Sequence, residues 1–177
     1  MNKYLEEVQN GMDLLAADPR SIFVGQATKY KGHAISSQLT KYPDDKKIEF
    51  PVAEDMQAGF SLGLALEGYI PVCIYPRFDF AILACNQIFN HIDRWSLLCQ
   101  NSQPKIIIKI NVGSKVPLDG GLQHTANYVD AFRSMSQTIR IFDLKEPKQI
   151  YFAYEDALNC IGSSILIEYP QFYNKEV

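Results

Sequence analysis

Short apolar runs rich in β-branched residues alternate along this chain with segments of helical periodicity. The runs that we expect to form strands cover residues 21–25, 48–50, 70–75, 105–110, 138–142 and 164–169. Between them, apolar residues recur at helical spacing over 3–17, 54–67, 79–99, 125–135 and 147–160. Strands that alternate with helices in this way predict an α/β domain, with three α/β/α layers around a mainly parallel sheet.

The chain has 177 residues, enough for one domain with a substantial core and too few for two ordinary ones, so we expect a single domain over 1–177. A net charge of −3 and the lack of a basic run argue against a nucleic-acid partner. No apolar run approaches the roughly 20 residues of a membrane span. The N-terminus reads as an acidic amphipathic helix rather than a signal peptide, so we expect a cytoplasmic protein without a membrane partner.

The four cysteines are scattered and form no Cys-x-x-Cys pair or cluster with histidine. We therefore expect buried thiols in a reducing compartment and no metal site on this chain.

In parallel sheets, ligands bind beyond the carboxyl ends of the strands. Three predicted strands are followed by stretches with polar or aromatic side chains, namely 25–26, 75–80 and 111–124. We expect these three stretches to meet at one edge of the sheet.

The stretch 49–80, EFPVAEDMQAGFSLGLALEGYIPVCIYPRFDF, is the most informative part of the chain. Glu54 is expected in the first turn of an apolar helix. Acidic residues are common there because the helix dipole favours them, and Asp55 would serve that purpose equally well. Gly59, Phe60 and Gly63 follow. Glycines inside a helix cost about 1 kcal/mol each relative to alanine. Close packing within the domain or contact with another subunit would each account for them.

These residues together resemble the thiamine-diphosphate enzymes, in the domain that holds the aminopyrimidine ring of the cofactor. The likeness is to the N-terminal domain of the beta subunit of the pyruvate and branched-chain 2-oxo acid dehydrogenases, and to transketolases, and it extends over residues 7–173. VAEDMQAGFSLGLALEGYIPVCIYPRFDFAILACNQIFNHI matches that family's stretch without a gap, and GGLQHTANYVDAFRSM resembles its histidine-containing loop.

The resemblance implies two catalytic residues. Glu54 would form a hydrogen bond with a ring nitrogen of the aminopyrimidine, and desolvation of a carboxyl group favours a proton shared with the ring. His124 would lie near the reacting carbon and handle a proton.

The resemblance also implies residues that bind the cofactor. Phe80 matches the aromatic that stacks on the pyrimidine, and Phe78 and Tyr75 would line the same wall. Gln26 stands where the family has an acidic residue that points towards the cofactor, so one carboxylate of the usual proton network is missing here.

The family's metal and diphosphate motif, Gly-Asp-Gly followed by asparagine some residues later, is missing from this chain, and Asp119 is its nearest imitation. We therefore expect a separate, alpha-like chain to bind Mg²⁺ and the diphosphate, in a dimer or an α2β2 heterotetramer that shares thiamine diphosphate between chains. The beta subunit's second domain would begin near residue 173, so it is expected to be absent.

The predicted reaction makes or breaks a C–C bond next to a carbonyl, as in a 2-oxo acid decarboxylase or a transketolase-like enzyme. The alternative is a non-catalytic structural or regulatory subunit on the same domain. Gln26 and Ala27 in place of acids favour that alternative, whereas Glu54, Phe80 and His124 together oppose it.

Overall fold

The computed structural model describes residues 2–30, 38–115 and 119–173, and the strands in this part of the chain form one sheet. The sheet has the order β2-β1-β3-β4-β6-β5, and each neighbouring pair is parallel. The strands are β1 (Ser21–Gly25), β2 (Lys47–Glu49), β3 (Ile70–Tyr75), β4 (Ile107–Asn111), β5 (Arg140–Asp143) and β6 (Ser164–Glu168).

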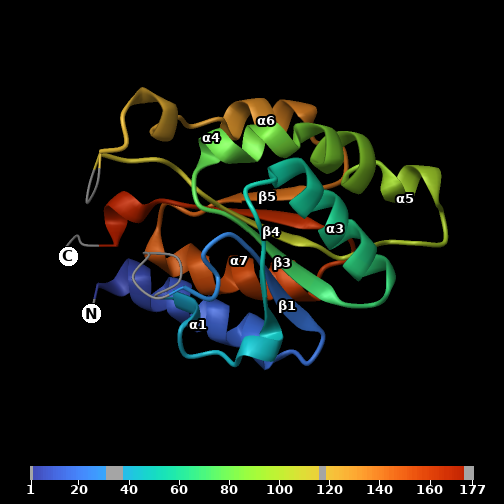
Figure 1. Ribbon diagram of the computed structural model, residues 1–177, viewed down its shortest axis with the longest axis horizontal. Coiled ribbons are helices and arrows are strands. Elements are labelled where there is room, and N and C mark those ends of the chain that lie inside the picture. The colour runs from blue at the N-terminus through green and yellow to red at the C-terminus, as the bar shows by residue number, and fades with distance from the viewer. Residues whose placement is uncertain (1, 31–37, 116–118, 174–177) are drawn as a thin grey trace.

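Helices cover both faces of the sheet (Figure 1). On one face, α1 (Lys3–Ala17) packs along α7 (Pro147–Asn159). The opposite face carries α3 (Glu54–Leu66), α4 (Phe78–Ala81) and α6 (Val129–Met135). The predicted three-layer α/β/α architecture is confirmed. Within the residues described, no helix has the length and apolar character needed to cross a membrane.

The central strands β3, β4 and β6 are buried along their whole length. This continuous burial is typical of a parallel sheet covered on both faces. It includes one ion pair, because Lys109 Nζ on β4 lies 2.9 Å from Glu168 Oε2 on β6. The hydroxyls of Tyr154 and Tyr173 donate hydrogen bonds to the Glu168 carboxylate. These bonds, together with the ion pair, offset the cost of burying its charge.

The region predicted as one long helix over 79–99 is helical but not continuous, so that prediction is wrong in its detail. After α4 come a 3₁₀ turn, η2 (Ile82–Ala84), a π-helix, η3 (Asn86–Ile92), and α5 (Trp95–Leu98). At the end of the π-helix, the Asp93 N–H donates to the carbonyl of Ile88, five residues earlier, at 2.8 Å. This wider turn sets Asp93 against the loop that precedes β5.

Asp93 is completely buried, and its carboxylate accepts hydrogen bonds from three consecutive backbone N–H groups. Those of Thr138 and Ile139 lie 2.8 Å from Oδ1, and that of Gln137 lies 2.9 Å from Oδ2. Because these groups are bound to Asp93, the strand begins at Arg140 and not at 138 as predicted.

Other boundaries also shift for local reasons. We predicted a helix from 125, but Asn127 Oδ1 accepts a bond from the Val129 N–H at 3.0 Å, and α6 begins there. The preceding residues include a 3₁₀ turn, η4 (Leu122–His124). Helix α3 ends near the predicted position because Gly68 adopts a φ of 89°, a left-handed conformation that favours glycine. Two short 3₁₀ turns, η1 (Asp44–Lys46) and η5 (Pro170–Phe172), complete the described elements.

The Asp93 network predicts a large loss of stability on substitution. Asp93→Ala leaves three backbone N–H donors without their acceptor and empties a fully buried position, so we expect the free energy of unfolding to fall by about 3 kcal/mol. Urea denaturation followed by circular dichroism measures this difference. The matched control is Asp130→Ala on α6, whose side chain is 98% exposed and whose removal should change stability by less than about 0.5 kcal/mol. Equal effects of the two substitutions would contradict this account of the loop.

Candidate functional site

The strand order places the predicted site at a reversal in the sheet. Strand β1 lies between β2 and β3, so the chain moves to one side of β1 and then returns to the other. Ligands of such sheets bind at this switch point, beyond the carboxyl ends of the strands. Gln26 directly follows β1, Tyr75 ends β3, and Glu54 begins the helix after β2.

Glu54 is fixed by two hydrogen bonds from those neighbouring strand ends. The Tyr75 hydroxyl donates to the backbone carbonyl of Glu54 at 3.0 Å, and Gln26 Nε2 donates to Glu54 Oε1 at 3.1 Å. Burial raises the pKa of the Tyr75 phenol well above its ordinary value, so this group stays a donor. Glu54 as a whole residue is only 6% exposed. The structure therefore brings Gln26, Glu54 and Tyr75 together.

Phe80 and His124 form a second pair at the same edge of the sheet. Their ring centroids lie 5.4 Å apart with an interplanar angle of 89°, an edge-to-face contact between α4 and η4. Both side chains are partly exposed. An aromatic ring and an imidazole in this arrangement can hold a flat ring and present a nitrogen beside it.

The position of His124 depends on Gly113, a residue that our sequence reasoning did not single out. A Cβ at Gly113 would lie 1.8 Å from the carbonyl oxygen of His124, so no other residue fits there. The signal available in the sequence was a glycine two residues past the end of β4. In the described part of the chain, the buried Nδ1 of His124 has no hydrogen-bond partner.

Phe78 and Tyr75 lie in the core and not on the wall of an open site. Phe78 is fully buried and packs edge-to-face on Phe132, with ring centroids 4.8 Å apart. Tyr75 is 1% exposed. Their predicted contact with a cofactor stays a prediction, and in this structure the Tyr75 hydroxyl bonds to the backbone of Glu54.

The two glycines of α3 have different surroundings. A Cβ at Gly59 would lie 3.4 Å from Gln87 Oε1, an ordinary contact with the end of a flexible side chain, so packing among the described residues does not require a glycine there. A Cβ at Gly63 would meet nothing within 4 Å, and packing among the described residues gives no reason for it. Phe60, between them, is 39% exposed and touches Phe50, with ring centroids 5.4 Å apart.

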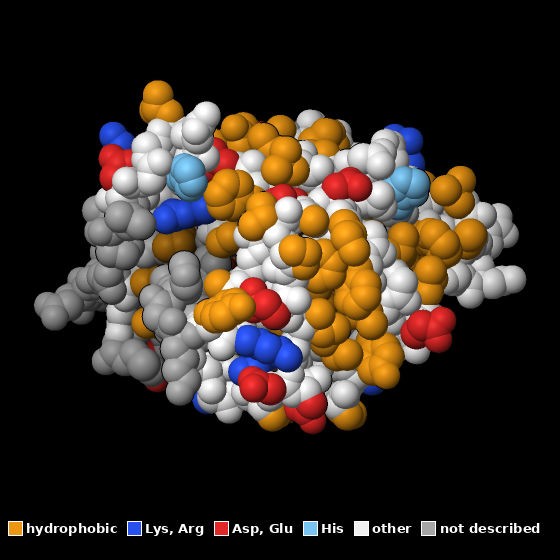
Figure 2. Space-filling model, in the orientation of Figure 1, with side chains coloured by type: hydrophobic (Ala, Val, Ile, Leu, Met, Phe, Trp, Pro, Cys, Tyr) orange, Lys and Arg blue, Asp and Glu red, His pale blue; other side chains and the backbone are white. Residues whose placement is uncertain are grey.

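Gly63 lies within an exposed apolar surface, which we call the α3 surface (Figure 2). It comprises the exposed apolar side chains of α3, of the residues before it and of η2, which packs on α3: Val52, Met56, Phe60, Leu66, Ile82 and Leu83. Val52 is 81% exposed and Met56 62%. Apolar surfaces of this kind mark sites of protein association in soluble proteins.

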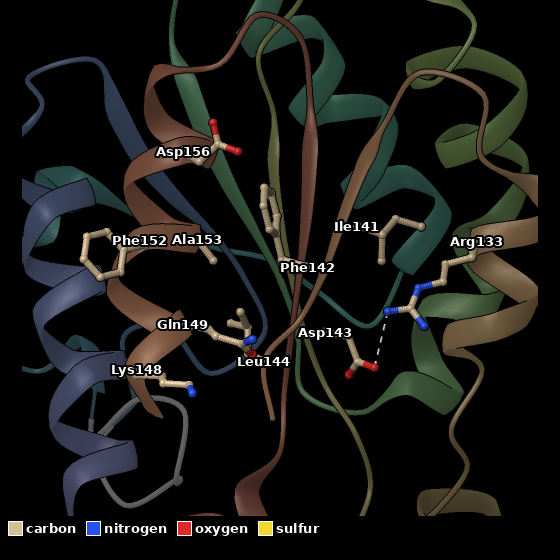
Figure 3. Close-up of a pocket in the computed structure, with 10 residues that line it drawn as sticks. All are labelled: Arg133, Ile141, Phe142, Asp143, Leu144, Lys148, Gln149, Phe152, Ala153 and Asp156. Carbon is tan, nitrogen blue, oxygen red and sulfur yellow. Dashed lines mark hydrogen bonds and ion pairs between the residues drawn. The ribbon is translucent and has the colours of Figure 1, made fainter. Parts of the chain in front are cut away.

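An open groove of about 800 Å³ lies elsewhere, between α6, β5 and α7 (Figure 3). Its lining includes Ile141 and Phe142 of β5, and Arg133 Nη2 lies 3.4 Å from Asp143 Oδ2. None of the predicted site residues lines this groove. We therefore place the candidate site at the switch point, where polar and aromatic groups converge, and not in this groove.

No group of three or more His, Cys, Asp or Glu side chains that could hold a metal ion occurs among the described residues. The donor set that the candidate residues offer is one carboxylate and one amide, which bond to each other, and one imidazole, which contacts Phe80. Such groups suit a nitrogen heterocycle with hydrogen-bonding edges, because each can meet a ring nitrogen or an amino group.

Residues 5–174 match the family model described as transketolase, pyrimidine binding domain. The beta subunit of the mitochondrial pyruvate dehydrogenase E1 component from Rattus norvegicus is 30% identical over 107 residues, which are 58% of this chain and 30% of that protein. The 3-methyl-2-oxobutanoate dehydrogenase subunit beta from Mycobacterium tuberculosis is 20% identical over 168 residues, covering 92% of this chain and 47% of that protein.

A solved structure described as a split gene transketolase, inactive beta4 tetramer, superposes with a TM-score of 0.67 at 20% identity. The match covers 94% of this chain and 51% of that one, and at this identity it shows the fold alone. The chain thus spans about half or less of each of these proteins. Because the family model covers nearly the whole chain, the chain belongs to the thiamine-diphosphate-dependent transketolase pyrimidine-binding domain family.

Proposed function

We propose that this chain is the pyrimidine-binding subunit of a two-chain thiamine-diphosphate enzyme that makes or breaks a C–C bond next to a carbonyl. The observation that carries the proposal is the fixed, buried carboxylate of Glu54 at the switch point, held through its backbone by Tyr75 and through Oε1 by Gln26. A carboxylate held in this way can present its second oxygen to a ligand without reorganising.

When bound, thiamine diphosphate supplies an electron sink for the carbon that reacts. Glu54 would form the hydrogen bond to a ring nitrogen of the pyrimidine, and its low exposure would keep water from competing for that bond. Phe80 would support the face of the ring. His124, in edge contact with Phe80, would hold or move a proton beside the reacting carbon.

The second half of the site would come from another chain. A partner with the Gly-Asp-Gly and asparagine motif would bind the diphosphate and Mg²⁺, since magnesium prefers hard oxygen ligands. The α3 surface is the natural contact, because the helix that presents Gly63 and Phe60 also begins with Glu54. A partner seated there would close the site over Glu54.

The assembly would be a dimer or an α2β2 heterotetramer. The split transketolase neighbour is described as an inactive beta4 tetramer. By analogy, we propose that this chain also associates, and that it gains activity only with its partner.

Substitution of Glu54 tests the proposed function most directly. We expect Glu54→Gln to lower the kcat of the complex by at least about a hundredfold, because the hydrogen bond to the pyrimidine loses its ionisable group. The fold should persist, since glutamine has the same shape. Activity assays of the complex and thermal unfolding of the variant chain check both parts.

The matched control is Asp55→Asn in the same first turn of α3, whose side chain is exposed. If Glu54 served only the helix dipole, the two substitutions would have equal and small effects. Near-normal activity of Glu54→Gln would overturn the catalytic assignment of Glu54. The alternative, a non-catalytic subunit on the same domain, would then be favoured, as the amide at Gln26 also suggests.

Substitution of Gly63 tests the interface. A Cβ at this position would meet none of the described residues within 4 Å, so we expect Gly63→Ala to stabilise the isolated chain by up to about 1 kcal/mol through helix propensity. In contrast, Gly63→Leu should weaken assembly with the partner, because a bulky side chain blocks close approach. Denaturation of the isolated chain and sedimentation of the mixture measure the two effects.

Asn10→Leu provides a control for added apolar surface, because Asn10 is exposed on α1, on the opposite face of the sheet. It should leave assembly unchanged. If Gly63→Leu assembles as tightly as the natural chain, the α3 surface is not the interface.

A further inference from the structure

Glu49, the last residue of β2, forms several hydrogen bonds with the loop that follows β1. Glu49 pairs with Gly25 in the parallel ladder, so its side chain reaches the residues just beyond the end of β1. Its Oε1 accepts the Ala27 N–H at 2.7 Å, and its Oε2 accepts the Lys29 N–H at 3.0 Å. Thr28 Oγ1 also lies 3.0 Å from Oε2. One carboxylate therefore holds three consecutive residues of the loop.

The loop that Glu49 holds has an unfavourable backbone conformation. Ala27 has a φ of 57°, and it is the one non-glycine residue with a positive φ in the described part of the chain. A side chain in this left-handed region is sterically disfavoured, and such conformations persist only where the surroundings impose them. Both N–H bonds to Glu49 lie at or close to the strained position. One comes from Ala27 itself and the other from Lys29, two residues later.

This loop is also the segment that carries Gln26. The strained residue comes directly after Gln26, so the turn at Ala27 decides where the Gln26 side chain points. In the structure it points at Glu54, with Nε2 3.1 Å from Oε1. The chain between Glu49 and Glu54 is fastened to the same place, because the Phe50 N–H donates to the Gly25 carbonyl at 2.9 Å.

We propose that Glu49 is a positioning residue for the cofactor site: it holds Ala27 in its left-handed conformation and thereby aims the Gln26 amide at the Glu54 carboxylate. The assignment of Glu54 to the cofactor rests on the proposed function, but the action of Glu49 on Gln26 does not. The side-chain hydrogen bonds that Glu49 forms with described residues go to Ala27, Thr28 and Lys29 and not to Glu54. It acts through the backbone of the loop.

The first test uses the isolated chain and needs no activity. In ¹⁵N-labelled protein, Glu49→Ala should increase the hydrogen-exchange rate of the Ala27 and Lys29 amides by about tenfold or more, because each loses a charge-assisted bond. The side-chain amide signals of Gln26 should move towards those of a solvated glutamine. Glu6→Ala, which removes an exposed glutamate on α1, is the control and should change neither.

A second substitution separates positioning from general stabilisation. Glycine adopts a positive φ without steric cost. Ala27→Gly introduced into Glu49→Ala should therefore return the Gln26 signals towards their original positions, although the carboxylate stays absent. If Glu49→Ala does not fold, Glu49→Gln keeps the length of the side chain and one acceptor oxygen, and it should show a smaller shift in the same direction.

The third measurement links the loop to the cofactor. With the partner chain and Mg²⁺, Glu49→Ala should weaken thiamine-diphosphate binding by about tenfold, and Ala27→Gly should recover part of the loss. Gln26 signals that stay unchanged in Glu49→Ala would overturn the proposal whether or not the cofactor binds. If the Gln26 signals respond as expected but the natural complex binds no cofactor, the positioning role stands and the proposed function fails.

Discussion

Each strand that the structure describes runs parallel to its neighbours, so all of them end at one edge of the sheet, and the strand order decides which ends are adjacent. Because β1 lies between β2 and β3, the residues that follow β1 lie between those that follow β2 and those that follow β3. Gln26 and Tyr75 are far from Glu54 in sequence, but for this reason both donate hydrogen bonds to it. The candidate site is thus a consequence of the topology, and its precision comes from the hydrogen bonds that topology permits.

Carboxylates that accept backbone N–H groups hold the loops of this domain. Asp93 binds three consecutive N–H groups before β5, and Glu49 binds two in the loop after β1. Such charge-assisted hydrogen bonds are stronger than neutral ones, and more so where they are buried. Each also stabilises a backbone conformation that local sequence preferences alone would not favour. The π-helix that ends at Asp93 and the left-handed Ala27 are the visible results.

Much of the fold could be predicted from periodicity, because strands such as β1 and helices such as α1 and α7 follow their apolar patterns closely. The failures lie where long-range polar contacts override local pattern, as in the region 79–99, where Asp93 is drawn to residues 137–139. For the site, the choice of Phe80 and His124 followed a family resemblance, and their contact with each other is a finding of the structure. The burial of Tyr75 and Phe78 and the close approach of Gly113 to His124 could not be predicted, because they depend on side-chain packing between distant segments.

We propose that this chain supplies the pyrimidine side of a site that a second chain completes. The fixed carboxylate, the partly exposed Phe80 and the uncovered α3 surface are consistent parts of that half-site. The most direct test is calorimetric titration of thiamine diphosphate with Mg²⁺ into this chain, into the partner chain, and into their mixture. The account predicts saturable one-to-one binding in the mixture and none to this chain alone. Tight binding to this chain alone, or no binding to a mixture in which the two chains associate, would contradict it.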